Sequence, residues 1–393
     1  MINVKRAVKN ALIRTNLFNP AYAVYRKVRD RFAPDPFVLM EKTGIAPPPT
    51  TAVLEITTKC NLSCGMCWLQ INTERSRQEI TPEEMRVLLE RLPSSLRSIT
   101  ITGGELFLRK EIFDVCDRLK DRGIEIMLLT NGFIPERLEQ LIARNPAVRK
   151  VQISLDGPKE LHNAIRGSNK SFDKIIESTR VLQARPDIEA NFLTVIMDEN
   201  LDSLPHMVDI AKAMGKNKTF FEFERRYDKQ TLQDSATEFI DLDNYWQLTV
   251  GDQLMPPYSL DRLRSAVEKV ETHARANRFL VQYLPPSFRQ RMAQWYERKI
   301  REDYRVRCNH FLIPRINAQG DVVPCFGISR PFGNLVKQTF EDIWNSDEYR
   351  RFRMDMLRRN LLPICDTCYQ CVPVASKRGG EMTPEPMSAA IPS

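Results

Sequence analysis

The sequence predicts an α/β fold in which a partial (β/α)6 TIM-like barrel precedes a small, cysteine-rich C-terminal domain. Between residues 51 and 225, short β-rich runs alternate with helical patterns. Consecutive units of this kind form parallel sheets with right-handed crossovers, which curve toward a barrel. The nine cysteines fall in three tight groups plus one outlier, Cys116. Clustered cysteines in a long chain indicate metal or redox chemistry more often than disulfides.

The composition is that of an ordinary globular protein. Hydrophobic residues make up 42% of the 393 residues, charged residues make up 27%, and the 15 glycines and 25 prolines are spread out. These values exclude collagen, a coiled coil and wholesale disorder. No stretch approaches the roughly 20 unbroken apolar residues of a membrane span. The first residues lack the apolar run of a signal peptide, so we expect a cytoplasmic protein.

Residues 1–50 form a basic N-terminal extension. Val4, Val8, Ala11 and Leu12 share one helical face, which is the pattern of a short amphipathic helix. Two interpretations are open. The helix either packs on the main domain, or makes peripheral contact with an anionic membrane surface or a phosphorylated substrate.

Residues 51–225 contain the predicted barrel. Its strands are predicted at 53–56, 98–101, 124–129, 150–155, 189–195 and 219–223. Helices are predicted at 110–122, 135–144, 172–184 and 204–213, and Thr81 with Glu84 forms a capping box that opens one more helix. In such a sheet the ligand site lies at the carboxyl ends of the strands.

Three further segments complete the chain. They are a helical connecting and capping segment at 226–305, a small metal-stapled domain at 306–375 and a disordered tail at 376–393. The metal-stapled domain is predicted to contain a hairpin over 312–325 and helices that start near Thr339 and Ser346.

The first cysteine group consists of Cys60, Cys64 and Cys67, with the spacing C-x3-C-x2-C directly after the first predicted strand. Three thiolates on one loop can hold three irons of a cubane cluster and leave the fourth iron open to a small molecule. An open coordination position marks a catalytic metal centre. The alternative is a zinc site, or a cluster completed by a fourth cysteine from elsewhere in the chain.

Glycine and polar residues follow the next three predicted strands. The sequences are Thr102-Gly103-Gly104-Glu105, Thr130-Asn131-Gly132 and Ser154-Leu155-Asp156-Gly157-Pro158, with Arg166 downstream. Glycines let a ligand approach the backbone, and Glu105, Ser154 and Arg166 can receive an amine, a ribose hydroxyl and a carboxylate. Together with the cysteines, these strand ends predict one ligand site.

Residues 51 to about 225 resemble the core of the radical S-adenosylmethionine (SAM) superfamily. In that family the cysteine loop holds a [4Fe–4S] cluster whose open iron is chelated by the amino and carboxylate groups of SAM. The resemblance implies that Cys60, Cys64 and Cys67 are the cluster ligands. It implies SAM contacts from Gly103, Gly104, Glu105, Asn131, Ser154, Arg166 and Val195.

The resemblance also implies an activity. Such an enzyme reductively cleaves SAM to a 5′-deoxyadenosyl radical, which takes a hydrogen atom from an unactivated carbon of the substrate. The electron comes from a low-potential donor of the flavodoxin or ferredoxin type. We therefore expect an oxidoreductase-like radical SAM enzyme.

Five further cysteines lie near the C-terminus: Cys308, Cys325, Cys365, Cys368 and Cys371. Their spacing alone leaves a structural zinc ribbon as open as an iron–sulfur cluster. Gly333-Asn334-Leu335 and the run from Phe340 to Ser346 resemble the SPASM/twitch extension of radical SAM enzymes, which carries auxiliary [4Fe–4S] clusters. Five thiolates allow one such cluster, held by Cys308, Cys325, Cys365 and either Cys368 or Cys371, with Cys368 favoured.

A cluster with four protein ligands has no open iron for substrate, so we expect it to transfer electrons, as in dehydrogenation or epimerisation. A purely structural role is the alternative.

A free Cys371 is a candidate hydrogen-atom donor that quenches a substrate radical. Glu222 and Glu224, at the end of the sixth predicted strand, are candidate substrate contacts, unless they only pair with the neighbouring arginines. Cys116 is expected in the core.

The 58 basic and 50 acidic residues give a net charge of +8, which favours a small anionic or sugar-like substrate, such as a phosphorylated one. The alternative is a maturase of a ribosomally made peptide, as SPASM enzymes often are. A non-catalytic iron–sulfur or zinc protein that binds nucleic acid is a distant alternative, because no helix-turn-helix, RNP or finger pattern occurs. The sequence leaves the substrate open, and with it the choice among dehydrogenation, epimerisation and bond formation.

Overall fold

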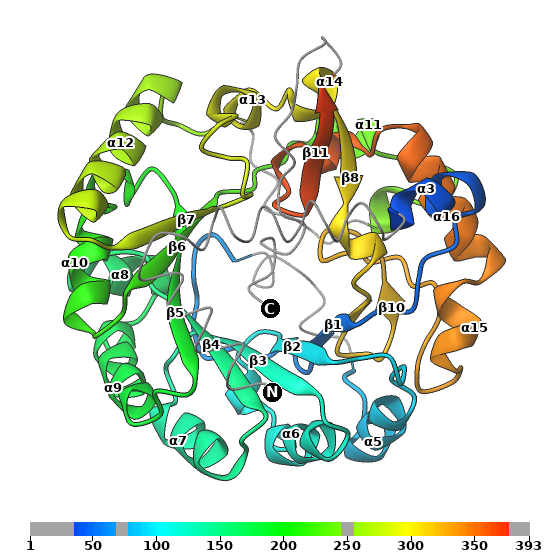
Figure 1. Cartoon of the computed structure of the whole chain (residues 1–393), viewed down its shortest axis with the longest axis horizontal. Helices are drawn as coiled ribbons and strands as arrows, with labels where there is room; N and C mark the ends of the chain where they lie inside the picture. Colours follow the sequence, from blue (N-terminus) through cyan, green and yellow to red (C-terminus); the bar gives the residue numbers. More distant parts are fainter. Residues whose placement is uncertain (1–34, 68–77, 245–254, 377–393) are drawn as a thin grey trace.

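The computed structural model describes residues 35–67, 78–244 and 255–376. The predicted amphipathic helix near the N-terminus and the predicted tail beyond residue 376 lie outside the described residues. Within them, no helix is both long and apolar enough to cross a membrane. Figure 1 shows the strands arranged in an open arc with helices on its outer side.

The core is a nine-stranded sheet with the order β10-β9-β1-β2-β3-β4-β5-β6-β7. Its central strands are those that the sequence predicts: β1 Thr51–Glu55, β2 Ser98–Thr102, β3 Glu125–Thr130, β4 Val148–Ser154, β5 Glu189–Ile196 and β6 Lys218–Phe223. Each pairs in parallel with the next along the chain. They are rich in β-branched and aromatic residues, which suit strands buried on both faces. The predicted partial barrel is confirmed.

Helices connect these strands and cover the outer face of the sheet (Figure 1). The predicted ones are α5 Pro82–Glu90, α6 Ile112–Asp121, α7 Pro135–Arg144, α9 Ser171–Gln183 and α10 His206–Ala213. Two short 3-10 turns, η2 Leu106–Leu108 and η3 Leu201–Ser203, were not predicted. In α5 the capping box forms as predicted, because Thr81 Oγ1 accepts from Glu84 N at 3.2 Å and the Glu84 carboxylate accepts from Thr81 N at 2.8 Å. Helix α8, Lys159–Arg166, is not predicted from the sequence.

Three strands of the sheet come from beyond residue 225. Strand β7, Leu280–Leu284, extends the sheet in parallel next to β6. Strand β9, Arg315–Ile316, pairs in parallel with β1, and β10, Val322–Val323, pairs antiparallel with β9. The short β9–β10 pair is the predicted hairpin, and it brings the cysteine-rich segment against the first strand of the barrel.

The described part of the segment between β6 and β8 contains several helices besides strand β7. It contains α11 Lys229–Asp234, η4 Leu242–Asn244, α12 Leu260–Ala276, α13 Met292–Tyr296 and α14 Ile300–Asp303. The C-terminal region adds an antiparallel pair, β8 Tyr304–Cys308 with β11 Cys371–Ser376, together with η5 Asn309–Phe311, α15 Phe340–Trp344, α16 Asp347–Arg358 and η6 Pro363–Thr367. Both helices predicted there are present, and Thr339 and Ser346 are their N-caps.

The segment before β1 is fastened to the C-terminal region. Helix α3, Pro36–Thr43, packs on α16, and Arg350 Nε donates to Thr43 O at 2.9 Å. Further along, Trp344 Nε1 donates to Pro47 O at 3.0 Å. These contacts fix the entry into β1.

Cys116, the cysteine outside the three groups, is fully buried in the hydrophobic core, as predicted.

At the edge of the sheet opposite the cysteine loop, Glu189 at the start of β5 pairs with Lys218 at the start of β6 and with Lys150 in β4. Burial opposes ionisation of Glu189, but Lys218 outweighs it and the pKa falls to about 2. The folded-state pKa therefore lies below the unfolded value of about 4.3, so the stabilisation is fully present at neutral pH. It is lost only as the pH falls from about 4 toward about 2.

We predict that Glu189→Gln lowers the free energy of unfolding at pH 7 by about 1–2 kcal/mol, because the partly exposed pairs are screened by solvent. Anaerobic urea denaturation measures this change. Glu125→Gln is the control, since Glu125 is exposed and lies 4.0 Å from Arg149, and it should change stability by less than about 0.5 kcal/mol. Equal losses of unfolding free energy in Glu189→Gln and Glu125→Gln would contradict the stabilising role of the Glu189 ion pairs.

Candidate active site

The loop that carries Cys60, Cys64 and Cys67 follows β1 at the carboxyl edge of the sheet. Cys64 is buried, and Cys60 and Cys67 are half-buried. Two side chains donate toward the sulfurs: Asn131 Nδ2 lies 3.7 Å from Cys60 Sγ, and Arg166 Nη1 lies 3.6 Å from Cys64 Sγ. Hydrogen-bond donors of this kind can also donate to the sulfur of a metal-bound cysteine.

Gly103 and Gly104 hold the base of this loop. Gly104 N donates to Thr57 O and Glu105 N donates to Lys59 O, both at 2.8 Å. A Cβ on Gly103 would lie 2.2 Å from Thr57 O, and one on Gly104 would lie 2.1 Å from Lys59 O. From the sequence, these glycines are expected to let a ligand approach the backbone. In the structure the backbone that approaches them is that of the cysteine loop itself.

Glu105 lies fully buried beneath the site. Its carboxylate accepts from Thr130 Oγ1 and Asn131 N at 2.9 Å and from Phe107 N at 3.1 Å. Burial raises the pKa of Glu105 to about 7, although these hydrogen bonds favour the charged form. The carboxylate thus joins the end of β2 to the end of β3, and its contact with the SAM amine stays a prediction.

Asp156, which the sequence analysis did not single out, organises the ends of β4 and β5. It is fully buried; its Oδ2 accepts from Arg166 Nε at 2.6 Å and its Oδ1 accepts from Val195 N at 3.0 Å. Its backbone N donates to His162 Nδ1 at 3.1 Å. Arg166, at the end of α8, is therefore held between Asp156 and Cys64. In the sequence alone, Asp156 is recognisable only as part of a turn. Nothing in the sequence indicates that its side chain is buried.

Val195 and Glu222 are neighbours on adjacent strands, because they are paired in the β5–β6 register. Ser154 ends β4 and is paired with Leu193 in the β4–β5 register. These residues follow one another along the same edge as the cysteine loop. The structure thus brings the predicted SAM residues of β4 and β5 beside the predicted substrate residue of β6.

Glu222 is buried and pairs with Arg225 at 3.1 Å, and Glu224 pairs with Arg226 at 3.3 Å. Burial raises the pKa of both glutamates. Both carboxylates therefore do pair with neighbouring arginines. Their contact with substrate stays a prediction.

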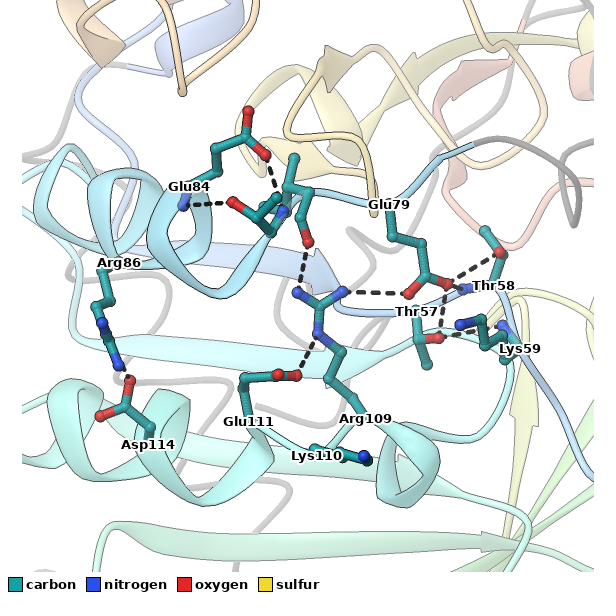
Figure 2. Close-up of polar contacts among 12 residues, drawn as sticks. Thr57, Thr58, Lys59, Glu79, Glu84, Arg86, Arg109, Lys110, Glu111 and Asp114 are labelled. Atoms are coloured by element: carbon teal, nitrogen blue, oxygen red, sulfur yellow. Dashed lines mark hydrogen bonds and ion pairs between the residues drawn. The ribbon is translucent and has the colours of Figure 1, made fainter.

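The other side of the cysteine loop is held by Glu79 (Figure 2). Glu79 Oε1 accepts from Thr58 N and Thr57 Oγ1, both at 2.8 Å, and Oε2 accepts from Arg109 Nη1 at 3.1 Å. Arg109 also donates to Ile80 O at 2.7 Å. Burial opposes ionisation of Glu79, but the hydrogen bonds outweigh it and hold its pKa below the ordinary value. The sequence analysis missed this residue because its partners are about 20 and 30 positions away.

The five C-terminal cysteines come together from four segments. Cys308 and Cys371 are paired in the β8–β11 register, Cys365 and Cys368 lie in and after η6, and Cys325 follows β10. Gly327 N lies 3.3 Å from Cys325 Sγ, and Gln370 N lies 3.4 Å from Cys368 Sγ. Cys371 is buried at the start of β11.

The surroundings of these cysteines fit an iron–sulfur cluster. Two buried groups beside them, Asn309 Nδ2 and Thr367 Oγ1, have no hydrogen-bond partner in the described part of the chain. Donors of this kind suit a group that brings its own acceptors, as cluster sulfides do. No three His, Cys, Asp or Glu side chains among the described residues can hold a single metal ion. A cubane does not need that proximity, because each thiolate binds its own iron.

Comparison with known protein families agrees with both sites. Residues 54–211 match the model of the radical SAM superfamily, and residues 308–369 match that of SPASM, an iron–sulfur cluster-binding domain. The chain therefore belongs to the radical SAM superfamily and is an enzyme of that class with a C-terminal SPASM domain. Its cofactors are SAM, a catalytic [4Fe–4S] cluster and auxiliary iron–sulfur.

Three similar proteins illustrate the range of this family. The PqqA peptide cyclase of Xanthomonas euvesicatoria is 26% identical over 326 residues, which cover 79% of this chain and 78% of the relative. A probable GTP 3′,8-cyclase of Methanococcus vannielii is 30% identical over 174 residues, which cover 43% of this chain and 57% of the relative. Streptococcus suis SuiB bound to precursor peptide SuiA shares the fold, with a TM-score of 0.59 and 14% identity, over 94% of this chain and 84% of SuiB.

We predict that Gly104→Ala reduces the iron bound after anaerobic reconstitution by about one cluster, from about eight to about four atoms per chain. The added Cβ would displace the backbone before Cys60. Gly65→Ala is the matched control, because a Cβ at Gly65, inside the cysteine loop, meets nothing within 4 Å. Iron and acid-labile sulfide analysis gives the result, and equal iron in both variants would refute the role of Gly104.

We also predict that Glu79→Gln speeds the loss of iron to a chelator and lowers the free energy of unfolding by about 2 kcal/mol. The amide cannot accept from Thr58 and Arg109 with both of its atoms, so one buried donor loses its partner. Glu83→Gln serves as the control, because Glu83 is exposed and lies 3.7 Å from Arg86. Similar rates of iron release in Glu79→Gln and Glu83→Gln would show that Glu79 does not stabilise the cysteine loop.

Proposed function

We propose that this enzyme modifies a ribosomally made peptide by SAM-dependent radical chemistry. The observation that carries the proposal is the similarity to a peptide cyclase over 79% of the chain, a length that exceeds the radical SAM domain alone. The fold of SuiB, whose structure holds a precursor peptide, supports the same substrate class. The alternative of a peptide maturase is therefore favoured over the small anionic substrate.

A small anionic substrate is the second candidate. The net charge of +8 and the 30% identity to a probable GTP cyclase support it. That similarity covers 43% of this chain, and the chain spans only 57% of the relative. It therefore supports the common radical chemistry more than a common substrate.

In the proposed site, a [4Fe–4S] cluster held by Cys60, Cys64 and Cys67 supplies, when reduced, the electron that cleaves SAM and so generates a hydrogen-abstracting radical. We propose that the electron comes from a donor protein of the flavodoxin or ferredoxin type. The protein itself provides the positioning and the exclusion of water that such a radical requires. Glu79, Gly103 and Gly104 fix the loop.

Along the strand ends, Asn131, Ser154, Arg166 and Val195 are the proposed SAM residues. Asn131 and Arg166 would contact SAM while their side chains also donate toward the cysteine sulfurs. Glu222 and Glu224 are the proposed substrate residues, because they lie at the carboxyl end of β6 next to that edge.

For the auxiliary cluster we propose the ligands Cys308, Cys325, Cys365 and Cys368. The backbone N–H groups that approach Cys325 Sγ and Cys368 Sγ support this set. Cys371 then packs against β8, paired with Cys308. The residue is 2% exposed, so we propose a packing role for Cys371 in place of hydrogen-atom donation to substrate.

The test follows deuterium into 5′-deoxyadenosine. The reconstituted enzyme, SAM and a chemical reductant are incubated with deuterated short peptides encoded beside the gene, and in parallel with deuterated GTP. We expect deuterium transfer from a peptide whatever the final product is, and no 5′-deoxyadenosine from a variant with Cys60, Cys64 and Cys67 all replaced by Ala. Transfer from GTP and from none of the peptides would overturn the proposal.

A further inference from the structure

An arginine lies between the end of β6 and the C-terminal cysteines. Arg225 Nη2 pairs with Glu222 Oε1 at 3.1 Å. On the other side, its guanidinium lies 4.0 Å from the ring centroid of Phe326 and 5.3 Å from that of Tyr369. One side chain therefore contacts both the barrel and the C-terminal domain.

The two aromatic residues directly follow two of the proposed ligands, Cys325 and Cys368. Their rings are stacked, with centroids 5.9 Å apart and an interplanar angle of 6°. A guanidinium over an aromatic face is held by cation–π attraction, which strengthens when water is excluded. The Phe326–Tyr369 pair thus fixes the position of the Arg225 charge relative to the ligand backbone.

The charge is only partly balanced. Arg225 Nη1 is buried and has no hydrogen-bond partner in the part of the chain that the structure describes. A guanidinium stays protonated at every accessible pH, so its field on the cysteines is permanent.

A second arginine makes a useful contrast. Arg315 lies 5.7 Å from the Phe326 ring, but it is buried in a close ion pair with Glu55 at the end of β1. Arg225 and Arg315 therefore both place a paired positive charge beside the ring that follows Cys325. Arg225 differs in that its Nη1 has no hydrogen-bond partner among the described residues and in that it also contacts Tyr369, which follows Cys368.

We propose that Arg225 is a positioning residue that raises the reduction potential of the auxiliary cluster, and that Glu222 moderates this effect from the substrate side of the barrel. A fixed positive charge stabilises the more negative, reduced state of a cluster, and a carboxylate beside it does the opposite. Substrate or product that changes the contact of Glu222 with Arg225 would then change the potential of the cluster.

This inference rests on the proposed auxiliary ligands and does not depend on the identity of the substrate. Deuterium transfer from a peptide tests the substrate, whereas a redox titration tests Arg225, so the two can fail separately. The titration uses the fully reconstituted enzyme and electron paramagnetic resonance. The catalytic cluster is recognised in the same sample by its response to SAM and serves as the internal reference.

The test compares a variant that removes the positive charge with a variant that removes the negative charge. We expect Arg225→Met to move the potential of the auxiliary cluster to a more negative value and Glu222→Gln to move it to a more positive one. Arg226→Met is the matched control, because the neighbouring Arg226 pairs with Glu224, and it should leave the potential unchanged. Arg225→Lys, which keeps the charge, should lie closer to the wild type than Arg225→Met.

An unchanged potential in Arg225→Met, or shifts of the same sign in Arg225→Met and Glu222→Gln, would overturn the proposal. An equal shift of the catalytic cluster would also overturn it, since that result indicates a general change of structure. If Arg225→Met fails to retain the auxiliary iron, the positive shift required of Glu222→Gln decides the question.

Discussion

The site depends on one close backbone approach, between residues 57–59 and residues 103–105. Hydrogen bonds continue there beyond the ends of β1 and β2, and only glycine at positions 103 and 104 leaves room for the carbonyl oxygens of the loop. The three cysteines follow immediately after this contact. Their position relative to the carboxyl edge of the sheet is therefore determined by backbone geometry, before any cofactor binds.

Buried and partly buried carboxyl groups then join the strand ends to that loop. Glu79, Glu105 and Asp156 each accept several hydrogen bonds, and their donors come from segments far apart in the sequence. A buried carboxylate is costly unless its oxygens have partners. Each carboxylate therefore fixes the position of the groups that donate to it. Arg166 and Asn131 reach the sulfurs of Cys64 and Cys60 because of such contacts.

Sequence reasoning was sufficient where the signal is local. The strands β1 to β6 are continuous runs rich in β-branched and aromatic residues, and Thr81 and Thr339 cap their helices through neighbours three positions away. Strands β7, β8 and β11 were missed because their pairing partners lie more than 50 positions away. Asp156 and Glu79 were missed for the same reason: in the sequence each resembles a turn or surface residue, whereas long-range packing buries Asp156 and covers most of Glu79.

The two cysteine sites are linked through β6. Glu222 lies beside Val195 in the sheet, on the side of the predicted SAM residues, and pairs with Arg225, which contacts the aromatic rings that follow Cys325 and Cys368. Because β9 pairs with β1, the C-terminal region is attached to the barrel on its other side as well. The barrel mouth therefore lies between two charged contacts, Glu222 with Arg225 and Glu55 with Arg315. A substrate held there would lie within the electrostatic influence of both cysteine sites.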